Sequence, residues 1–245
     1  MKTIPGIRDL ATVASYPRLR QMVRCARAAG LETLLDYQRL ALLAAAVRRC
    51  RALEGDAIEC GSYRGGGAAL IGQVLEGTGK TVHVCDSFEG LPAPGEKDNF
   101  HHEGDFNDTS AARVRDGLKS LGVRAELHVG FFERTLPALA DRRFAFAHID
   151  VDLHQSVREC LEFCYPRMAA GAIMIFDDYA APTCHGAKAA VDEFFADKVE
   201  RVVRLSEPAH AARVGDASGS LRDDLRREVG GMLALPFVGE TLLRG

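Results

Sequence analysis

The sequence predicts an α/β fold in which a mostly parallel β-sheet is covered by helices on both faces. From Asp56 onward, short apolar runs alternate with longer amphipathic segments, which is the pattern of repeated strand–helix units. One run, AIMIF at residues 172–176, is apolar without interruption, as expected for a strand buried on both sides. The expected strands are 57–60, 81–85, 125–129, 144–149, 172–176 and 199–205, and the expected helices lie near 66–77, 110–121, 132–141, 154–168 and 185–197.

Residues 1–52 are expected to be helical, because apolar residues recur on one wide stripe and no Pro or Gly falls between Leu31 and Glu54. We predict a helical N-terminal extension over 1–52 and a main part over 53–245, which together form one structural domain. The extension could pair subunits in a homo-oligomer or wall a substrate pocket. Near the C-terminus, 221–229 are expected to form a charged helix, and the last residues could pair at a sheet edge.

Composition and charge exclude several classes of protein. The 245 residues include 31 Lys or Arg and 34 Asp or Glu, so the formal net charge of −3 offers no basic footprint for nucleic acid. The sequence shows no signal-peptide core and no run of about 18 apolar residues. Its seven cysteines are odd in number and contain no CxxC pair. We therefore expect a cytoplasmic protein with reduced thiols and no nucleic-acid or membrane partner.

A glycine-rich turn follows the first expected strand, in the run AIECGSYRGGG at residues 57–67. In an open parallel sheet, ligands bind at the carboxyl ends of the strands, and glycine there lets the backbone approach a ligand closely. The second expected strand ends in Asp86, an acid placed to accept hydrogen bonds from both hydroxyls of a ribose. Together the two features predict a cofactor that contains adenosine, and they leave a nicotinamide cofactor and S-adenosylmethionine both open.

Four aspartates gather at the ends of the fourth and fifth expected strands, in the runs HIDVDLH and IMIFDDY. The polar residues of 148–154 alternate, so they share one face while the chain stays extended. Parallel neighbouring strands would bring Asp150 close to Asp177 and Asp178. Clustered carboxylates repel one another, and a bound cation is the natural compensation. Because all the ligand atoms are oxygens, Mg²⁺, Mn²⁺ or Ca²⁺ is favoured over Zn²⁺.

The histidines leave more than one interpretation open. His148 falls inside an apolar strand and is expected to be a core residue with a satisfied hydrogen bond. His101 and His102 lie in the segment 90–108, which is rich in Gly and Pro and long for a connection, so that it could be a lid or a mobile loop. His154 and His185 each open an expected helix. Any of these could face a substrate or solvent.

Several blocks of the sequence, in this order, resemble one family. They are ECGSYRGG, DSFEGLP, GFFERTLP, the long run from HIDVDLH to IMIFDDY, and GAKAAVDEFF. This set resembles the macrocin O-methyltransferase (TylF-type) family, whose members are S-adenosylmethionine-dependent and divalent-metal-dependent enzymes that methylate hydroxyls, often on sugars of natural products. The resemblance covers roughly residues 50–197. It implies a Rossmann-like methyltransferase fold and makes 53–245 the methyltransferase domain.

The resemblance also implies where the cofactor binds. The turn at 59–66 would surround the methionine part, Asp86 would hold the ribose with Ser87 beside it, and the block GFFERTLP would flank the adenine. The expected cofactor-binding residues are Glu59, Gly61, Ser62, Tyr63, Arg64, Gly66, Asp86 and Ser87. The family often has Val-Trp where this chain has Ser62 and Tyr63, so the contacts there differ from the family pattern.

For the reaction, the resemblance implies that Asp150, Asp177 and Asp178 hold Mg²⁺ and that Asp152 is the general base. A metal that lowers the pKa of a hydroxyl suits an acceptor with two vicinal oxygens, and a sugar of a natural product or polysaccharide is the leading expectation. Three alternatives remain open. They are an aromatic diol of the catechol type as acceptor, an NAD-type oxidoreductase, and a binding module without catalysis.

Overall fold

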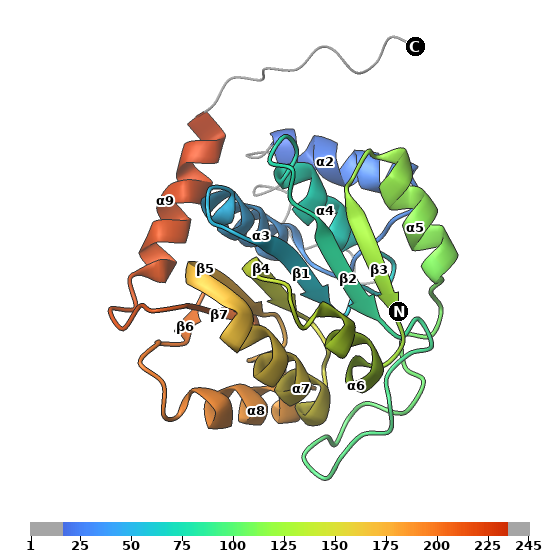
Figure 1. The fold of residues 1–245 in the computed structure, drawn as a ribbon, viewed down its shortest axis with the longest axis vertical. Helices are drawn as coiled ribbons and strands as arrows, with labels where there is room; N and C mark the ends of the chain where they lie inside the picture. Colours follow the sequence, from blue (N-terminus) through green and yellow to red (C-terminus); the bar gives the residue numbers. More distant parts are fainter. Residues whose placement is uncertain (1–16, 235–245) are drawn as a thin grey trace.

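The chain folds into one seven-stranded sheet with helices on both faces (Figure 1). The computed structural model describes residues 17–234. The strand order is β3-β2-β1-β4-β5-β7-β6, and the neighbours from β3 to β5 run parallel. The strands are β1 (Asp56–Cys60), β2 (Val82–Asp86), β3 (Ala125–Val129), β4 (Phe144–Ile149), β5 (Met168–Phe176), β6 (Val203–Arg204) and β7 (His210–Arg213). The predicted α/β class and Rossmann-like architecture are confirmed.

Two hydrophobic clusters, one on each face of the sheet, hold the helices in place. One face is covered by α2 (Pro17–Ala28), α3 (Tyr37–Cys50), α4 (Gly66–Val74), α5 (Ala111–Ser120) and α9 (Leu221–Ala234). The other face is covered by α6 (Phe132–Thr135), η1 (Leu136–Leu139), α7 (His154–Cys164), η2 (Tyr165–Arg167) and α8 (His185–Phe195). None of the helices within residues 17–234 combines the length and the apolar character that crossing a bilayer demands.

Of the predicted helical extension, residues 1–16 lie outside the described part of the chain, and residues 17–52 are helical only in part. A break at residues 29–36 separates α2 from α3, and α3 begins where the Asp36 carboxylate accepts a hydrogen bond of 2.8 Å from the Arg39 amide. The prediction of an uninterrupted helix after Leu31, which rested on the absence of Pro and Gly, is therefore wrong for residues 31–36. Helix α3 is buried over Leu40–Val47 and packs on β4 and β5. The boundary at residue 52 stays a prediction, and α3 contributes to the same core as the rest of the sheet.

The C-terminal edge of the sheet differs from the prediction. Instead of one strand over 199–205, only Val203–Arg204 is extended, and β7 inserts between β5 and β6 with antiparallel pairing on both sides. A short turn joins β6 to β7, and a connection of that length returns the chain antiparallel. The sequence does not predict strand β7, because its residues, HAAR, lack the alternation of apolar and polar side chains that marks a strand. The helix predicted at 221–229 is confirmed as α9, and the last residues lie outside the described part of the chain.

The strand order reverses direction between β1 and β4, which lie side by side at the centre of the sheet. The connection after β1 leads to one face and the connection after β4 leads to the other, so a crevice opens at the carboxyl ends of these two strands. The glycine turn after β1 and the acids after β4 therefore lie at the edge where ligands bind in such sheets.

Candidate active site

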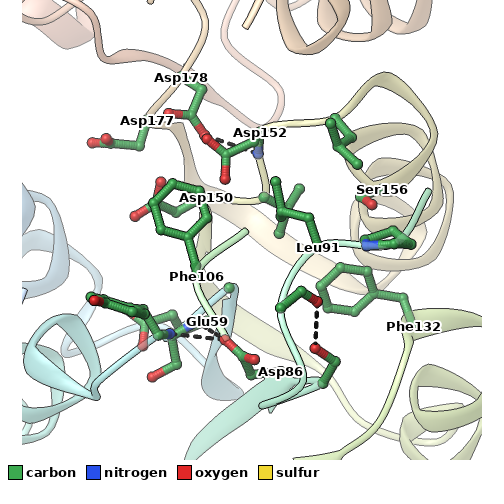
Figure 2. A pocket seen from close by; sticks show the side chains of 18 of the residues that line it. Glu59, Asp86, Leu91, Phe106, Phe132, Asp150, Asp152, Ser156, Asp177 and Asp178 are labelled. Carbon is green, nitrogen blue, oxygen red and sulfur yellow. Dashed lines mark hydrogen bonds between the residues drawn. The ribbon is translucent and has the colours of Figure 1, made fainter. Parts of the chain in front are cut away.

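A cavity of about 410 Å³ opens at the carboxyl ends of β1, β2, β4 and β5 (Figure 2). Segments outside the sheet complete its wall. They include the stretch from Thr33 to Arg39 that leads into α3, part of the 90–108 loop with Phe106, residues 130–133 after β3, and the first turns of α7. Figure 2 shows four aspartates on one side of the cavity and Glu59 and Asp86 on the other. Residues 33–39 of the N-terminal region thus form part of the wall of the cavity, which is one of the two roles predicted for this region.

Glu59 is buried at the end of β1 and has one oxygen free for a ligand. It is 1% exposed, and its Oε1 lies 3.1 Å from Nδ1 of His148, whereas Oε2 is buried without a hydrogen-bond partner. Burial lowers the pKa of His148, but the hydrogen bond and charge of Glu59 outweigh this effect and raise it. His148 is therefore the core histidine that the sequence predicts. Since a buried carboxylate oxygen without a partner is costly, Oε2 is a natural acceptor for a ligand group.

Asp86, at the end of β2, holds the glycine turn in shape. Its Oδ2 accepts hydrogen bonds from the amides of Ser62 and Tyr63, at 2.7 and 2.8 Å, and its Oδ1 accepts one of 2.7 Å from the amide of Phe88. The carboxylate also lines the cavity. Because each carboxylate oxygen can accept two hydrogen bonds, Oδ1 retains capacity for a ligand hydroxyl.

The other predicted cofactor residues divide into two groups. Ser62, Tyr63 and Ser87 line the cavity, and Oγ of Ser62 is buried without a partner. Arg64 is not among the lining residues and forms ion pairs with Glu32, at 2.5 Å, and with Asp108. Gly66 does not line the cavity either, and its amide donates to the backbone carbonyl of Glu32.

Gly61 lines the cavity, and it also allows the turn after β1 to pack against the backbone at the end of β4. It has a φ of +82°, and a Cβ at this position would lie 1.8 Å from the carbonyl oxygen of Asp150. Only glycine allows the turn after β1 to approach the end of β4 so closely. This contact joins the glycine turn to the acidic cluster.

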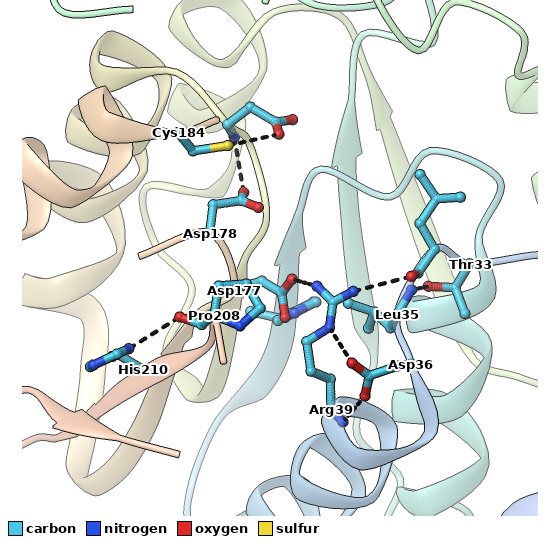
Figure 3. Close-up of polar contacts among 12 residues, drawn as sticks. Thr33, Leu35, Asp36, Arg39, Asp177, Asp178, Cys184, Pro208 and His210 are labelled. Atoms are coloured by element: carbon cyan, nitrogen blue, oxygen red, sulfur yellow. Dashed lines mark hydrogen bonds and ion pairs between the residues drawn. The ribbon is translucent and has the colours of Figure 1, made fainter. Parts of the chain in front are cut away.

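Asp150, Asp177 and Asp178 form the cluster that the sequence predicts, with one oxygen from each within 4.8 Å of the others. Backbone hydrogen bonds continue beyond the ends of the strands and fix the positions of two of these aspartates. The amide of Asp150 donates to the carbonyl of Cys60, and the amide of Asp177 donates to the carbonyl of Ile149. Asp177 is 2% exposed and forms an ion pair with Arg39 of α3 (Figure 3).

The carboxylates carry more negative charge than this one arginine balances. Burial, followed by the charges of Asp177 and Asp178, raises the pKa of Asp150 well above its usual range. Burial and Asp177 raise the pKa of Asp178 to about 6. The three carboxylates are buried at Asp177 and partly buried at Asp150 and Asp178. A set of oxygen ligands with this excess of negative charge fits a hard divalent cation, which would balance the charge.

Asp152 reaches the cavity by a backbone conformation that the strand pattern does not predict. β4 ends at Ile149, and Asp152 has a φ of +58°, so the expected alternation over 148–154 does not continue. The side chain of His148 contacts Glu59. His154, at the start of α7, contacts Lys97 and Glu193 and not the cluster of aspartates. The amide of Asp152 donates to Oδ2 of Asp178 at 3.1 Å, which keeps Asp152 beside the cluster.

The 90–108 loop is attached on both sides of the cavity. On one side, Oδ1 of Asp98 accepts a hydrogen bond of 2.9 Å from the amide of His154, and Lys97 forms an ion pair of 2.6 Å with Glu193 of α8. On the other side, Oδ1 of Asp108 accepts a hydrogen bond of 2.7 Å from the Tyr63 hydroxyl. The loop therefore spans the crevice.

Three site residues were missed or left open by the sequence. Arg39 belongs to no motif, and its position among apolar residues of a helix gave no sign that it would meet Asp177. His101 and Cys184 come within 3.5 Å of Asp152 and of each other, from segments far apart in the chain. The only signal was the unusual length of the loop that carries His101.

Comparison with known proteins agrees with the fold and the motifs. The profile of the Macrocin-O-methyltransferase (TylF) family matches residues 18–203. The 8-demethyl-8-(2,3-dimethoxy-alpha-L-rhamnosyl)-tetracenomycin-C 4'-O-methyltransferase of Streptomyces olivaceus is 32% identical over 146 residues, 54% of this chain and 56% of that protein. Mycinamicin III 3''-O-methyltransferase of Micromonospora griseorubida is 30% identical over 148 residues, 54% of this chain and 58% of that protein. The matched part thus spans little more than half the length of these curated relatives.

Solved structures share the architecture. The O-methyltransferase NovP is 27% identical, with a TM-score of 0.66 over 75% of this chain and 82% of that one. The calicheamicin methyltransferase CalS11 is 18% identical, with a TM-score of 0.68 over 88% of this chain and 100% of that one, a likeness that concerns the fold alone. The NAD-type oxidoreductase that the glycine turn left open is not supported by these relatives. Because the family profile matches most of the chain, this protein belongs to the macrocin O-methyltransferase (TylF) family.

Proposed function

We propose that this protein is an O-methyltransferase that depends on S-adenosylmethionine and a divalent cation, and that it methylates a hydroxyl of a sugar in a natural product. The observation that carries the proposal is the cluster of Asp150, Asp177 and Asp178 on one side of a switch-point cavity, opposite Glu59 and Asp86. The relatives support it, since one of them is named as the 4'-O-methyltransferase of a rhamnosyl-tetracenomycin and another as the 3''-O-methyltransferase of mycinamicin III.

The cofactor would occupy the side of the cavity that Glu59, Asp86 and the glycine turn form. Oε2 of Glu59 and Oγ of Ser62 are buried and without partners, so both are available to the amino and carboxylate groups of a methionine moiety. Oδ1 of Asp86 has capacity to accept from a ribose hydroxyl, with Ser87 nearby. Solved methyltransferases of the same fold are described with S-adenosylmethionine or S-adenosylhomocysteine bound, which supports S-adenosylmethionine as the cofactor.

The metal would be held by Asp150, Asp177 and Asp178. When bound, S-adenosylmethionine would supply an electrophilic methyl group, and Mg²⁺ or Mn²⁺ would lower the pKa of the acceptor hydroxyl. Three carboxylate oxygens leave about three positions of an octahedral ion for other oxygens, which favours an acceptor with two vicinal hydroxyls. A sugar suits this requirement, and an aromatic diol is the second candidate.

The protein's own residues would orient the acceptor and remove its proton. Asp152 would act as the general base, because it lies beside the cluster and lines the cavity. Phe106, Phe131 and Phe132 provide apolar walls that exclude water and hold the two reactants in line. The 90–108 loop would act as a lid over them.

We also propose a cytoplasmic setting and no nucleic-acid partner. Six of the seven cysteines are buried free thiols, which suits a reducing compartment, and the net charge is −3. Assembly into a homo-oligomer stays a prediction.

The substitution Asp177→Asn tests the metal role. With the acceptor that turns over best among glycosides with vicinal hydroxyls, such as methyl α-L-rhamnopyranoside, we expect S-adenosylhomocysteine formation to fall at least about 100-fold, because one charged ligand is lost. Binding of S-adenosylhomocysteine by calorimetry should stay within about threefold, since cofactor and metal use opposite sides of the cavity.

The matched control is Asp116→Asn, which makes the same change at an exposed site of α5 and should leave turnover unchanged. If turnover survives both EDTA and Asp177→Asn, the metal-dependent mechanism is wrong. If S-adenosylhomocysteine does not bind to the unmodified protein, the cofactor assignment is wrong.

A further inference from the structure

His101 reaches Asp152 from the 90–108 loop, behind the wall of the cavity. Its Nε2 lies 3.5 Å from Oδ1 of Asp152, and its Nδ1 lies 3.4 Å from Oδ2 of Asp105, so the ring is held between two carboxylates. The side chain of His101 is 9% exposed and is not among the residues that line the cavity. It can therefore touch Asp152 without touching a ligand in the cavity.

We propose that His101 is a positioning residue, which orients the Asp152 carboxylate for proton removal when the 90–108 loop is closed. The inference rests on the proposed role of Asp152 as the general base. It assigns the loop a second task besides covering the site, since the base is complete only when His101 is in place.

Cys184 shares this contact and makes the orientation specific. The Sγ of Cys184 lies 3.5 Å from Oδ1 of Asp152 and 3.5 Å from Nε2 of His101. Burial and the nearby Asp178 raise the pKa of Cys184, so it stays a thiol that can donate to Asp152. Both contacts fall on Oδ1, which leaves Oδ2 as the oxygen for the acceptor hydroxyl.

An isolated Asp152 would need such support. It has a φ of +58°, which residues other than glycine seldom adopt and which persists only where the surrounding structure holds it. At 3.5 Å the imidazole of His101 contacts Asp152 as an ion-pair partner without a hydrogen bond, and catalytic hydrogen bonds are often long in the free enzyme and tighten only when substrate binds.

The loop is built to bring His101 to this position. Upstream, Asp98 binds the amide of His154, and downstream Asp108 binds the Tyr63 hydroxyl, so His101 lies between two attachment points. The rings of Phe100 and Phe106 flank His101, with centroids 5.2 and 5.7 Å away. Aromatic neighbours on both sides restrict the rotamers of the imidazole.

The test compares His101→Phe, which keeps a ring without a donor, with His101→Gln, whose amide can still donate to Asp152. With the glycoside that turns over best, we expect His101→Phe to lower kcat about 10- to 100-fold, the usual effect of losing a residue that supports a functional carboxylate. KM for S-adenosylmethionine should be unchanged, and His101→Gln should recover most of kcat. The control is His102→Phe, at the exposed neighbour, which should behave like the unmodified protein.

A second measurement needs no acceptor. In ¹⁵N spectra of labelled histidines, the ring signals of His101, identified by their loss in His101→Gln, should shift when Asp152→Asn is introduced and stay in place in Asp116→Asn. No shift would mean that the two side chains do not interact, and this result would overturn the inference.

The kinetic outcomes separate this inference from the proposed function. Normal kcat in His101→Phe with an inactive Asp152→Asn overturns the positioning role alone. Normal kcat in Asp152→Asn removes the general base and with it part of the proposed function. Loss of one bound equivalent of Mn²⁺ in His101→Phe would make His101, Asp152 and Cys184 a metal site, which also overturns the positioning role.

Discussion

Charge compensation at single residues shapes the chemistry of this cavity. Burial and the neighbouring carboxylates raise the pKa of Asp150, Asp152 and Asp178 above the usual range of an aspartate. Asp177 forms an ion pair with Arg39. Without a cation the cluster is expected to retain protons, and with one it can be fully ionised. The acids could be predicted from the sequence because their positions at strand ends are a local feature. Arg39 could not, since only the packing of α3 on the sheet brings it to them.

Removing metal should make stability depend on pH through Asp178. Burial and Asp177 raise its pKa from the ordinary 3.8 to about 6 in the folded protein. Between these values the folded state binds a proton that the unfolded state has lost, so the free energy of unfolding falls as pH rises from about 4 to about 6. The loss from this group is at most about 3 kcal/mol.

The measurement is urea unfolding in EDTA across this pH range, for the unmodified protein and for Asp178→Asn. The variant cannot ionise at this position and should show a shallower decline. Added Mg²⁺ should reverse the decline in the unmodified protein, because it binds the ionised carboxylates. Parallel curves for the two proteins would contradict the shift assigned to Asp178.

At the scale of elements, the 90–108 loop contributes to a helix far from it in sequence. The N-cap position of α7 is Leu153, which has no side-chain acceptor, and Asp98 of the loop binds the free amide of His154 in its place. A Cβ at Gly186, at the start of α8, would lie 1.9 Å from the same carboxylate, so glycine leaves room for it. The sequence marked this loop as unusual by its length alone, because the contacts that attach it to α7 and to the glycine turn are with distant segments.

Asp98→Ala should therefore destabilise the protein although the residue is in a loop. Loss of an N-cap interaction costs about 1 kcal/mol, and we expect that decrease in the free energy of unfolding by urea. Lys97→Ala is the matched control, since its ion pair with Glu193 is exposed and should contribute less than about 0.5 kcal/mol. Equal stability of Asp98→Ala and the unmodified protein would show that the loop is not bound to α7 in solution.

At the scale of the whole molecule, the strand order brings together two sides of the cavity. The ends of β1 and β2 carry the proposed cofactor residues, and the ends of β4 and β5 carry the proposed metal ligands. The two sides meet where Gly61 packs against Asp150. Residues 33–39 and the 90–108 loop close the cavity from outside the sheet. Occupation of the cavity should therefore stabilise the entire fold.

Thermal unfolding with separate ligands checks this expectation. S-adenosylhomocysteine at about 100 times its Kd should stabilise by about 2.7 kcal/mol, which corresponds to a rise in Tm of several degrees. Mg²⁺ alone should raise Tm in the unmodified protein and not in Asp177→Asn, and NAD should leave Tm unchanged. A rise with NAD instead of S-adenosylhomocysteine would favour the oxidoreductase alternative.

The sequence by itself determined the fold class, the five parallel strands and the acids at their ends. These features are local, because burial on both sides of a strand and the residue that follows it are written in consecutive positions. Tertiary structure alone decided what depends on distant segments meeting. It placed β7 antiparallel at the sheet edge, Arg39 on Asp177, Arg64 away from the cavity, and His101 behind Asp152. Such contacts cannot be predicted from the periodicity of the sequence, because each joins residues that are far apart in the chain and close only in the folded structure.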